Sequence, residues 1–207
     1  MQSIERPPRI VRWTLRLEQA KALDGTVHAL EPWVRVWFGT GPWGSVLRGK
    51  WLGHAVHPTL TDVAIGAWVS GNLLDFLGGP DASASAQQLI GAGVVAAAPT
   101  AWTGWAEWSA LTPSDKRVGL VHALSNGVAI GLYAASWLAR KRGRHLTGIR
   151  LALGGAAVAG FGGYLGGHLT EGRRVASHHP AYDEPAVTPA RRAGALWSPA
   201  RSARRQR

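Results

Sequence analysis

The chain contains no cysteine among its 207 residues. This absence excludes disulfide bridges, thiolate metal centres, iron–sulfur clusters and haem attached through a C-x-x-C-H motif. The sequence also lacks a phosphate-binding glycine loop, a nucleophile–base pair and paired carboxylates at catalytic spacing. Residues 1–30 lack a continuous apolar core followed by a small-residue cleavage site, so we expect no secretory signal there. An enzyme is therefore the least favoured functional class.

Acidic residues are few, with 12 Asp and Glu against 23 Lys and Arg, which gives a formal net charge of +11. Such a balance indicates nucleic acid or an anionic membrane surface as a partner. No nucleic-acid-binding motif accompanies the basic residues, so we expect a lipid bilayer and no nucleic acid. The mean hydropathy of −0.03 averages polar ends with an apolar middle.

Four long apolar segments occupy that middle, at Leu60–Leu77, Ala86–Trp108, Val118–Leu138 and Ile149–Leu169. Each approaches or exceeds the roughly 20 residues with which a helix crosses a bilayer core. The fourth segment carries small residues at steps of four, which lets membrane helices pack closely. We therefore predict an all-α fold, an integral membrane four-helix bundle over residues 51–172. Pro99 should kink the second helix, and Thr100 and Thr103 should satisfy the freed backbone groups.

The two ends of the chain differ from this middle. Residues 1–50 mix Arg, Lys and Trp in a pattern that predicts amphipathic helices broken at Gly25 and Pro32. These helices either lie in the membrane interface or form a cap packed on the bundle. Residues 173–207 are rich in Arg, Pro and Ala, which predicts a disordered, solvated basic tail.

Ionisable side chains gather at one end of the predicted bundle. Helix direction alternates, so the start of the first helix, the end of the second, the start of the third and the end of the fourth share one face. Intramembrane ionisable residues are uncommon and are candidates for function. The face holds four histidines, His54, His57, His122 and His168, with Asp62, Glu107 and Asn126 as supporting residues.

Histidine in this setting indicates ligand binding, because imidazole is the commonest metal ligand and also binds haem iron. All four histidines are candidates for cofactor binding, and His57, His122 and His168 are candidates for a metal site. The carboxylates would accept a hydrogen bond from the ring nitrogen that does not bind the ligand, and so fix the histidine tautomer. Alternatively, the histidines only reach towards water or hydrogen-bond between helices. The binding hypothesis requires His57, His122 and His168 to approach one another.

Four blocks of the sequence resemble, in the same order, the bacterial membrane family called domain of unknown function 2231. The blocks are "WLGHAVHPTLTDVAIGAWVSGNLLDFLG", "PTAWTGWAEWSA", "RVGLVHALSNGVAIGLYAASWLARKRGR" and "GGYLGGHL". The resemblance covers about residues 45–170. The family's GHPLHP motif is GHAVHP here, which keeps His54 and His57 but has Ala55 in place of a proline.

The family's remaining motifs match at His122, Asn126 and His168, while Glu107 stands where the family usually has Asp. The resemblance implies a membrane protein without an assigned reaction. Some relatives carry a C-terminal Rieske domain, which suggests redox partners. Without cysteine, this chain does not hold that cluster.

Two functional hypotheses follow. The first is a multi-pass protein of the plasma membrane, with both termini cytoplasmic, that binds haem b or a transition metal and transfers electrons to a redox partner. The second is a non-catalytic membrane scaffold or assembly subunit whose histidines hold helices together.

Overall fold

The computed structural model describes residues 6–182, and every regular element within them is helical. Three short helices come first: α1 (Arg9–Glu18), α2 (Asp24–Val34) and α3 (Gly41–Leu47). Four long helices follow: α4 (His57–Leu77), α5 (Ser83–Trp108), α6 (Pro113–Lys141) and α7 (His145–Gly167). Short 3-10 and π turns complete the described chain: η1 (Lys21–Leu23), η2 (Arg35–Gly39), η3 (Pro80–Ala82), η4 (His168–Gly172) and η5 (Pro180–Tyr182). The all-α prediction is confirmed for this part of the chain.

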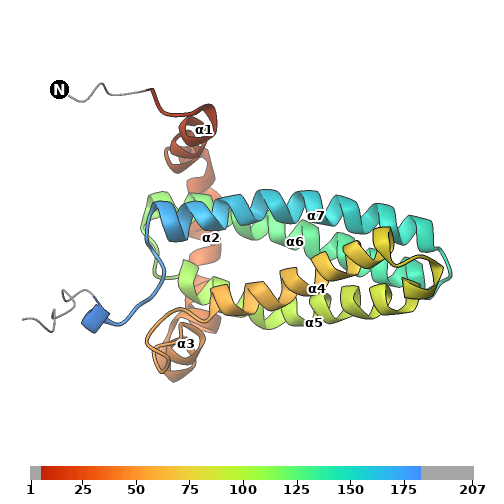
Figure 1. Cartoon of the computed structure of the whole chain (residues 1–207). Coiled ribbons are helices and arrows are strands. Elements are labelled where there is room, and N and C mark those ends of the chain that lie inside the picture. The colour runs from red at the N-terminus through yellow and green to blue at the C-terminus, as the bar shows by residue number, and fades with distance from the viewer. Residues whose placement is uncertain (1–5, 183–207) are drawn as a thin grey trace, which may run out of the picture.

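The four long helices form two antiparallel hairpins, α4 with α5 and α6 with α7, joined mainly through α5 and α6 (Figure 1). Each predicted apolar segment lies within one hairpin arm, and the fourth extends into η4. The helix α5 continues through Pro99 without interruption. Close by, the Thr103 hydroxyl donates to the Pro99 and Thr100 carbonyls at 3.1 and 2.8 Å, and Thr100 donates to Ala96 at 2.8 Å.

Two of these helical stretches are long and apolar enough to cross a membrane, Pro113–Lys141 and His145–Gly172. Apolar side chains also point outward from α4 and α5. Exposed examples are Val63, Leu73, Phe76, Leu77, Val95 and Trp102. The outer surface of all four long helices is therefore largely apolar.

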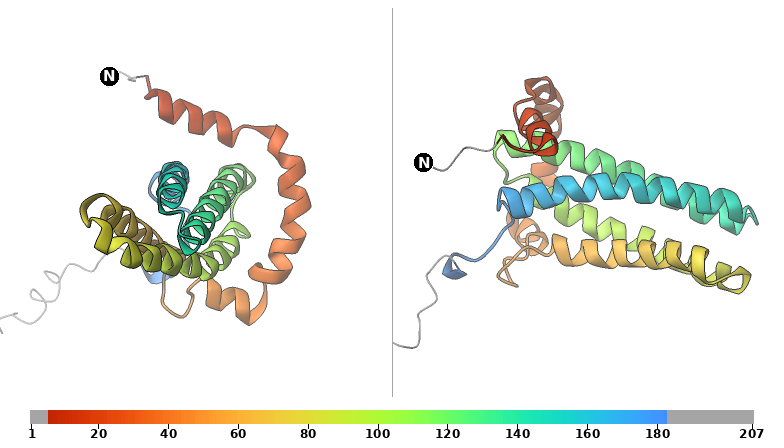
Figure 2. Two further views of the ribbon diagram at one scale, coloured as in Figure 1. Left: turned by 90° about the vertical axis from the view of Figure 1, so that its right-hand side faces the viewer. Right: turned by 45° about the horizontal axis from the view of Figure 1, so that its top comes forward.

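Residues 9–47 wrap around the end of the hairpins where α4 and α6 begin, and we call this segment the collar (Figure 2). Ion pairs attach it: Lys116 Nζ lies 2.6 Å from Glu31, and Arg117 Nε lies 2.6 Å from Asp24. Val27 and Val34 are buried against Trp108 and Leu120.

The predicted breaks at Gly25 and Pro32 are wrong, because α2 contains both residues. Gly25 lies in the first turn, where a helix has no backbone N–H bond to lose. At Pro32 the missing N–H is outweighed by tertiary contacts, since Glu31 is paired with Lys116 and Val34 is buried. Packing on the bundle thus overrides local propensity.

The two hairpins repeat one another. The sequence Val-Ala-Ile-Gly occurs at 63–66 in α4 and again at 128–131 in α6. At the same interval, three pairs of residues meet between the hairpins: His57 with His122, Trp68 with Tyr133, and Asp75 with Arg140. Equivalent positions of α4 and α6 therefore face each other at three levels along the bundle.

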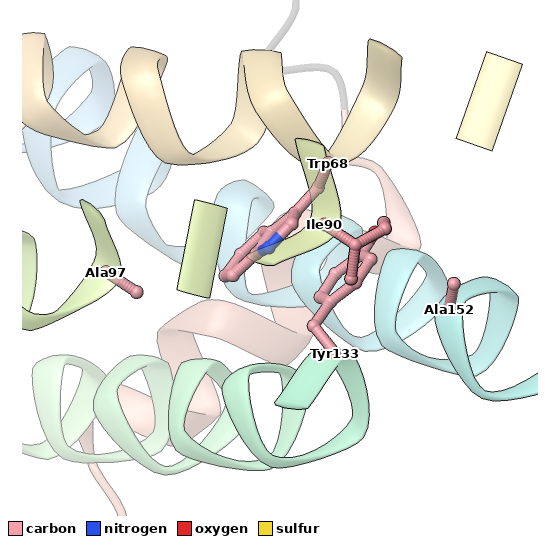
Figure 3. Packing of buried hydrophobic residues seen from close by; sticks show 5 residues of the cluster. All are labelled: Trp68, Ile90, Ala97, Tyr133 and Ala152. Atoms are coloured by element: carbon pink, nitrogen blue, oxygen red, sulfur yellow. The ribbon is translucent and has the colours of Figure 1, made fainter. Parts of the chain in front are cut away.

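The middle level is the main apolar core, drawn in Figure 3. The Trp68 and Tyr133 rings stack with centroids 4.2 Å apart and planes 9° apart. Each ring packs on a glycine in the other helix of the same hairpin, Trp68 on Gly93 of α5 and Tyr133 on Gly155 of α7. At the far level, Arg140 binds Asp75 through two hydrogen bonds of 2.7 and 2.6 Å, with both side chains buried.

Candidate functional site

A cavity of about 340 Å³ lies between the hairpins, from the collar end down to Trp68. Its wall is mostly apolar, with polar groups near the mouth. Its polar lining includes His57, Thr61, Glu107, His122 and Asn126. The volume falls in the range of about 300–1,000 Å³ that is usual for small-molecule pockets.

His57 is the first residue of α4, and Pro58 follows it in the first turn, where the fixed φ of proline suits a helix. Its Nδ1 lies 2.9 Å from the Thr100 carbonyl oxygen of α5. A carbonyl oxygen only accepts, so Nδ1 carries the hydrogen and Nε2 of the neutral ring carries a lone pair. Within the described chain, no hydrogen-bond partner of Nε2 is found.

His122 repeats this arrangement in the second hairpin. Its Nδ1 donates to the Gly162 carbonyl of α7 at 2.7 Å. Its Nε2, however, is occupied, because the Asn126 amide nitrogen lies 3.0 Å away and donates to it. Each histidine ring also packs on a glycine at the same distance. A Cβ added at Gly104 would lie 2.9 Å from His57 Cε1, and a Cβ added at Gly166 would lie 2.9 Å from His122 Cε1.

The two histidine rings approach each other across the cavity. Their centroids are 6.3 Å apart and their planes cross at 83°. Each ring is oriented by a backbone carbonyl at Nδ1, so Nε2 is the nitrogen with a lone pair in both rings, although in His122 that lone pair accepts from Asn126. The structure thus brings His57 and His122, but not His168, together in the cavity.

His168 does not join this pair, although it lies at the expected end of the bundle. Its Nε2 lies 2.7 Å from Glu18 of the collar, which also binds Arg173. Burial raises the pKa of Glu18, but hydrogen bonds from Arg173 and His168 outweigh it and hold that pKa below its usual value. His168 therefore helps to attach the collar to α7.

The other predicted residues are dispersed. His54 is exposed, and its Nδ1 contacts the neighbouring Ala55 carbonyl at 3.1 Å. Asp62 lies on the exposed side of α4, outside the cavity wall. Glu107 does line the cavity: one carboxylate oxygen accepts from Ser177 N and Oγ at 3.0 and 2.7 Å, and the other is buried with no hydrogen-bond partner among residues 6–182.

Residues 173–182, expected to belong to a disordered tail, cross the cavity mouth instead. Val175 and Ala176 line the cavity, Ser177 binds Glu107, and His179 N donates to the Gly53 carbonyl at 2.8 Å. We call this segment the strap. The rest of the predicted tail, residues 183–207, lies outside the described residues.

A metal site of three histidines is not formed in residues 6–182. Nowhere in that range do three His, Asp or Glu side chains gather closely enough to hold a metal ion. The reason is helix rotation: His122 faces the cavity, whereas His168 faces the collar. The predicted set of His57, His122 and His168 is thus reduced to a pair.

Sequence reasoning missed the groups that orient this pair, namely the Thr100 and Gly162 carbonyls and Gly104 and Gly166. The duplicated Val-Ala-Ile-Gly segment was the available signal. It would have aligned His57 with His122 and left His168 without an equivalent.

Comparison with known proteins supports the membrane assignment. Residues 53–179, well over half of the chain, match the family model described as "Predicted membrane protein (DUF2231)". Neither the curated proteins nor the solved structures give a match. The matched range contains both hairpins, the histidine pair and most of the strap. The chain is therefore a member of the DUF2231 family of predicted membrane proteins.

Proposed function

We propose that all four long helices cross the bilayer of the cell membrane and that the domain between residues 51 and 172 binds haem b between His57 and His122. The exposed apolar side chains of α4 and α5 support spanning by the first hairpin, because such a surface is stable only against lipid or protein. In this arrangement both termini lie on the collar side, which we assign to the cytoplasm. The exposed Trp33, Trp37 and Trp43 of the collar, and Trp51 shortly after it, fit a collar that lies in the interface.

The observation that carries the haem proposal is the spacing of the two rings. Metal–imidazole bonds of about 2 Å place two opposed ring centroids about 6 Å apart, and the observed distance is 6.3 Å. The ligands come from α4 and α6, and the wall around them is apolar. Bound haem would supply one-electron chemistry, and the protein would then exchange electrons with a redox partner.

The test is an absorbance spectrum of the protein purified from membranes and reconstituted with haemin. The proposal predicts a Soret band with the split α and β bands of a six-coordinate haem after reduction. His57→Ala and His122→Ala should each abolish that spectrum, whereas His28→Ala, a change in the exposed collar, should not. A wild-type protein that takes up no haem would overturn the proposal.

A second candidate function is a membrane scaffold without a cofactor. The full hydrogen bonding of His122, to Gly162 and Asn126, favours it, since a satisfied imidazole also joins helices. In that case His122→Gln retains stability, and neither wild type nor variant binds haemin.

A further inference from the structure

The repeat of the two hairpins gives His57 and His122 equivalent settings in the cavity. His57 and His122 occupy equivalent positions, each bound to a carbonyl of the second helix of its hairpin and each packed on a glycine four residues further on. A ligand between the rings would therefore meet two imidazoles that are held in the same way, and sequence differences beside the rings would distinguish them.

One such sequence difference lies next to Nε2 of the two histidines, the nitrogen that would bind a ligand. At the interval that relates His57 to His122, Thr61 is the equivalent of Asn126, and both residues line the cavity. Thr61 donates its hydroxyl hydrogen to the backbone carbonyl of His57 at 2.8 Å, and not to the imidazole ring. Asn126 donates to Nε2 of His122 at 3.0 Å.

We infer that Asn126 is an internal competitor for the ligand nitrogen of His122 and so sets the affinity of the site. This inference rests on the proposed function. Nε2 of His57 has no hydrogen-bond partner in the described part of the chain, whereas the lone pair of His122 Nε2 accepts from the Asn126 amide. A ligand binds first to His57, and coordination of His122 requires the Asn126 side chain to turn away.

Coordination by His122 would cost the hydrogen bond between the Asn126 amide and His122 Nε2. The net value of such a bond corresponds to roughly a three- to tenfold change in a dissociation constant. Asn126 thereby makes the second coordination step weaker and more reversible than the first. It is a positioning residue: it acts through His122 and does not itself bind the ligand.

The experiment exchanges the residues that differ between the repeats. Asn126→Thr copies the first hairpin into the second, and Thr61→Asn does the reverse. Haemin is titrated into the apo forms of wild type and both variants, and the low-spin six-coordinate spectrum reports coordination by both histidines. Asn126→Ser is measured alongside, so that one poorly folding variant does not decide the outcome.

Asn126→Thr and Asn126→Ser should bind haemin about three to ten times more tightly and raise the six-coordinate fraction, and Thr61→Asn should weaken binding by a similar factor. Equal or weaker binding by both Asn126 variants, with haem bound by wild type, would overturn the inference and leave the proposed function intact. Binding by the Asn126 variants alone would support the inference but remove haem as the ligand of the wild-type protein. Binding by none would overturn both.

Discussion

At the scale of single residues, the histidine pair depends on two glycines more than on any charged group. Gly104 and Gly166 allow the imidazole edges to lie directly on helices α5 and α7. Without that close approach, Nδ1 of each ring would not reach its carbonyl. The glycines therefore position the site, although neither would touch a ligand through a side chain.

Substituting Gly166 should consequently destabilise the protein. The added Cβ of Gly166→Ala would lie 2.9 Å from His122 Cε1, so the ring or the helix must move. We expect a loss of about 1–3 kcal/mol, the range typical of overpacking, measured as a lower midpoint of thermal unfolding in detergent.

Gly160 provides the control on the same helix, because nothing lies within 4 Å of a Cβ added there. Gly160→Ala should be neutral or stabilising by up to about 1 kcal/mol. Equal midpoints for the two alanine variants would contradict the packing that we describe around His122.

At the scale of helices, the sequence predicted much of what the structure contains. Segment length and apolar content located all four long helices, because both properties are local. Rotation of each helix about its axis is not local, which is why His122 and His168 were expected together but face different neighbours. The collar contacts were unpredictable for the same reason, since Glu18 and Arg173 are far apart in the chain.

The collar gives a prediction of pH dependence. Burial raises the pKa of Glu18, but hydrogen bonds from Arg173 and His168 outweigh burial and hold that pKa below its ordinary value. For Glu31 and Asp24 the largest cause is a hydrogen bond, from Lys116 and Arg117 respectively, which lowers the pKa of each carboxyl group. A carboxyl group with a lowered folded-state pKa stabilises the fold above its unfolded pKa of about 4. That contribution is lost as the pH falls through the folded-state value.

The collar should therefore remain attached at pH 5 and above and detach in the acid range below about pH 4. Limited proteolysis with an acid-active protease would report detachment as cleavage within residues 9–47. Glu18→Gln should detach at a higher pH than wild type, whereas Glu171→Gln, which alters an exposed carboxylate, should not. A cleavage profile that Glu18→Gln leaves unchanged would show that these ion pairs do not hold the collar.

At the scale of the whole molecule, the two ends of the helical hairpins differ in the segments that cover them. The collar, the strap and the cavity mouth lie together, while the opposite end of the described chain is formed by two short connections, η3 and the turn between α6 and α7 (Figure 1). If all four long helices span the membrane, as we propose, both connections lie on one side of it and the collar and strap on the other.

Reporter fusions test that topology. Fusions after Gly79 and after Arg144 should report the same side as each other and the opposite side from fusions at either terminus. If the fusion after Gly79 reports the side of the termini, α4 and α5 do not span as a hairpin. The bundle would then cross the membrane only through the stretches Pro113–Lys141 and His145–Gly172.

The buried pair of Asp75 and Arg140 has a consequence for assembly. These residues occupy equivalent positions in two hairpins of otherwise similar shape, yet they carry opposite charges. Two first hairpins from separate copies would bring two carboxylates together, and two second hairpins would bring two guanidinium groups together. Like charges buried at such a distance cost several kcal/mol or more. Charge repulsion thus disfavours the pairing of two identical hairpins. The Asp75–Arg140 ion pair favours the pairing of a first hairpin with a second one, although the two hairpins are similar in shape.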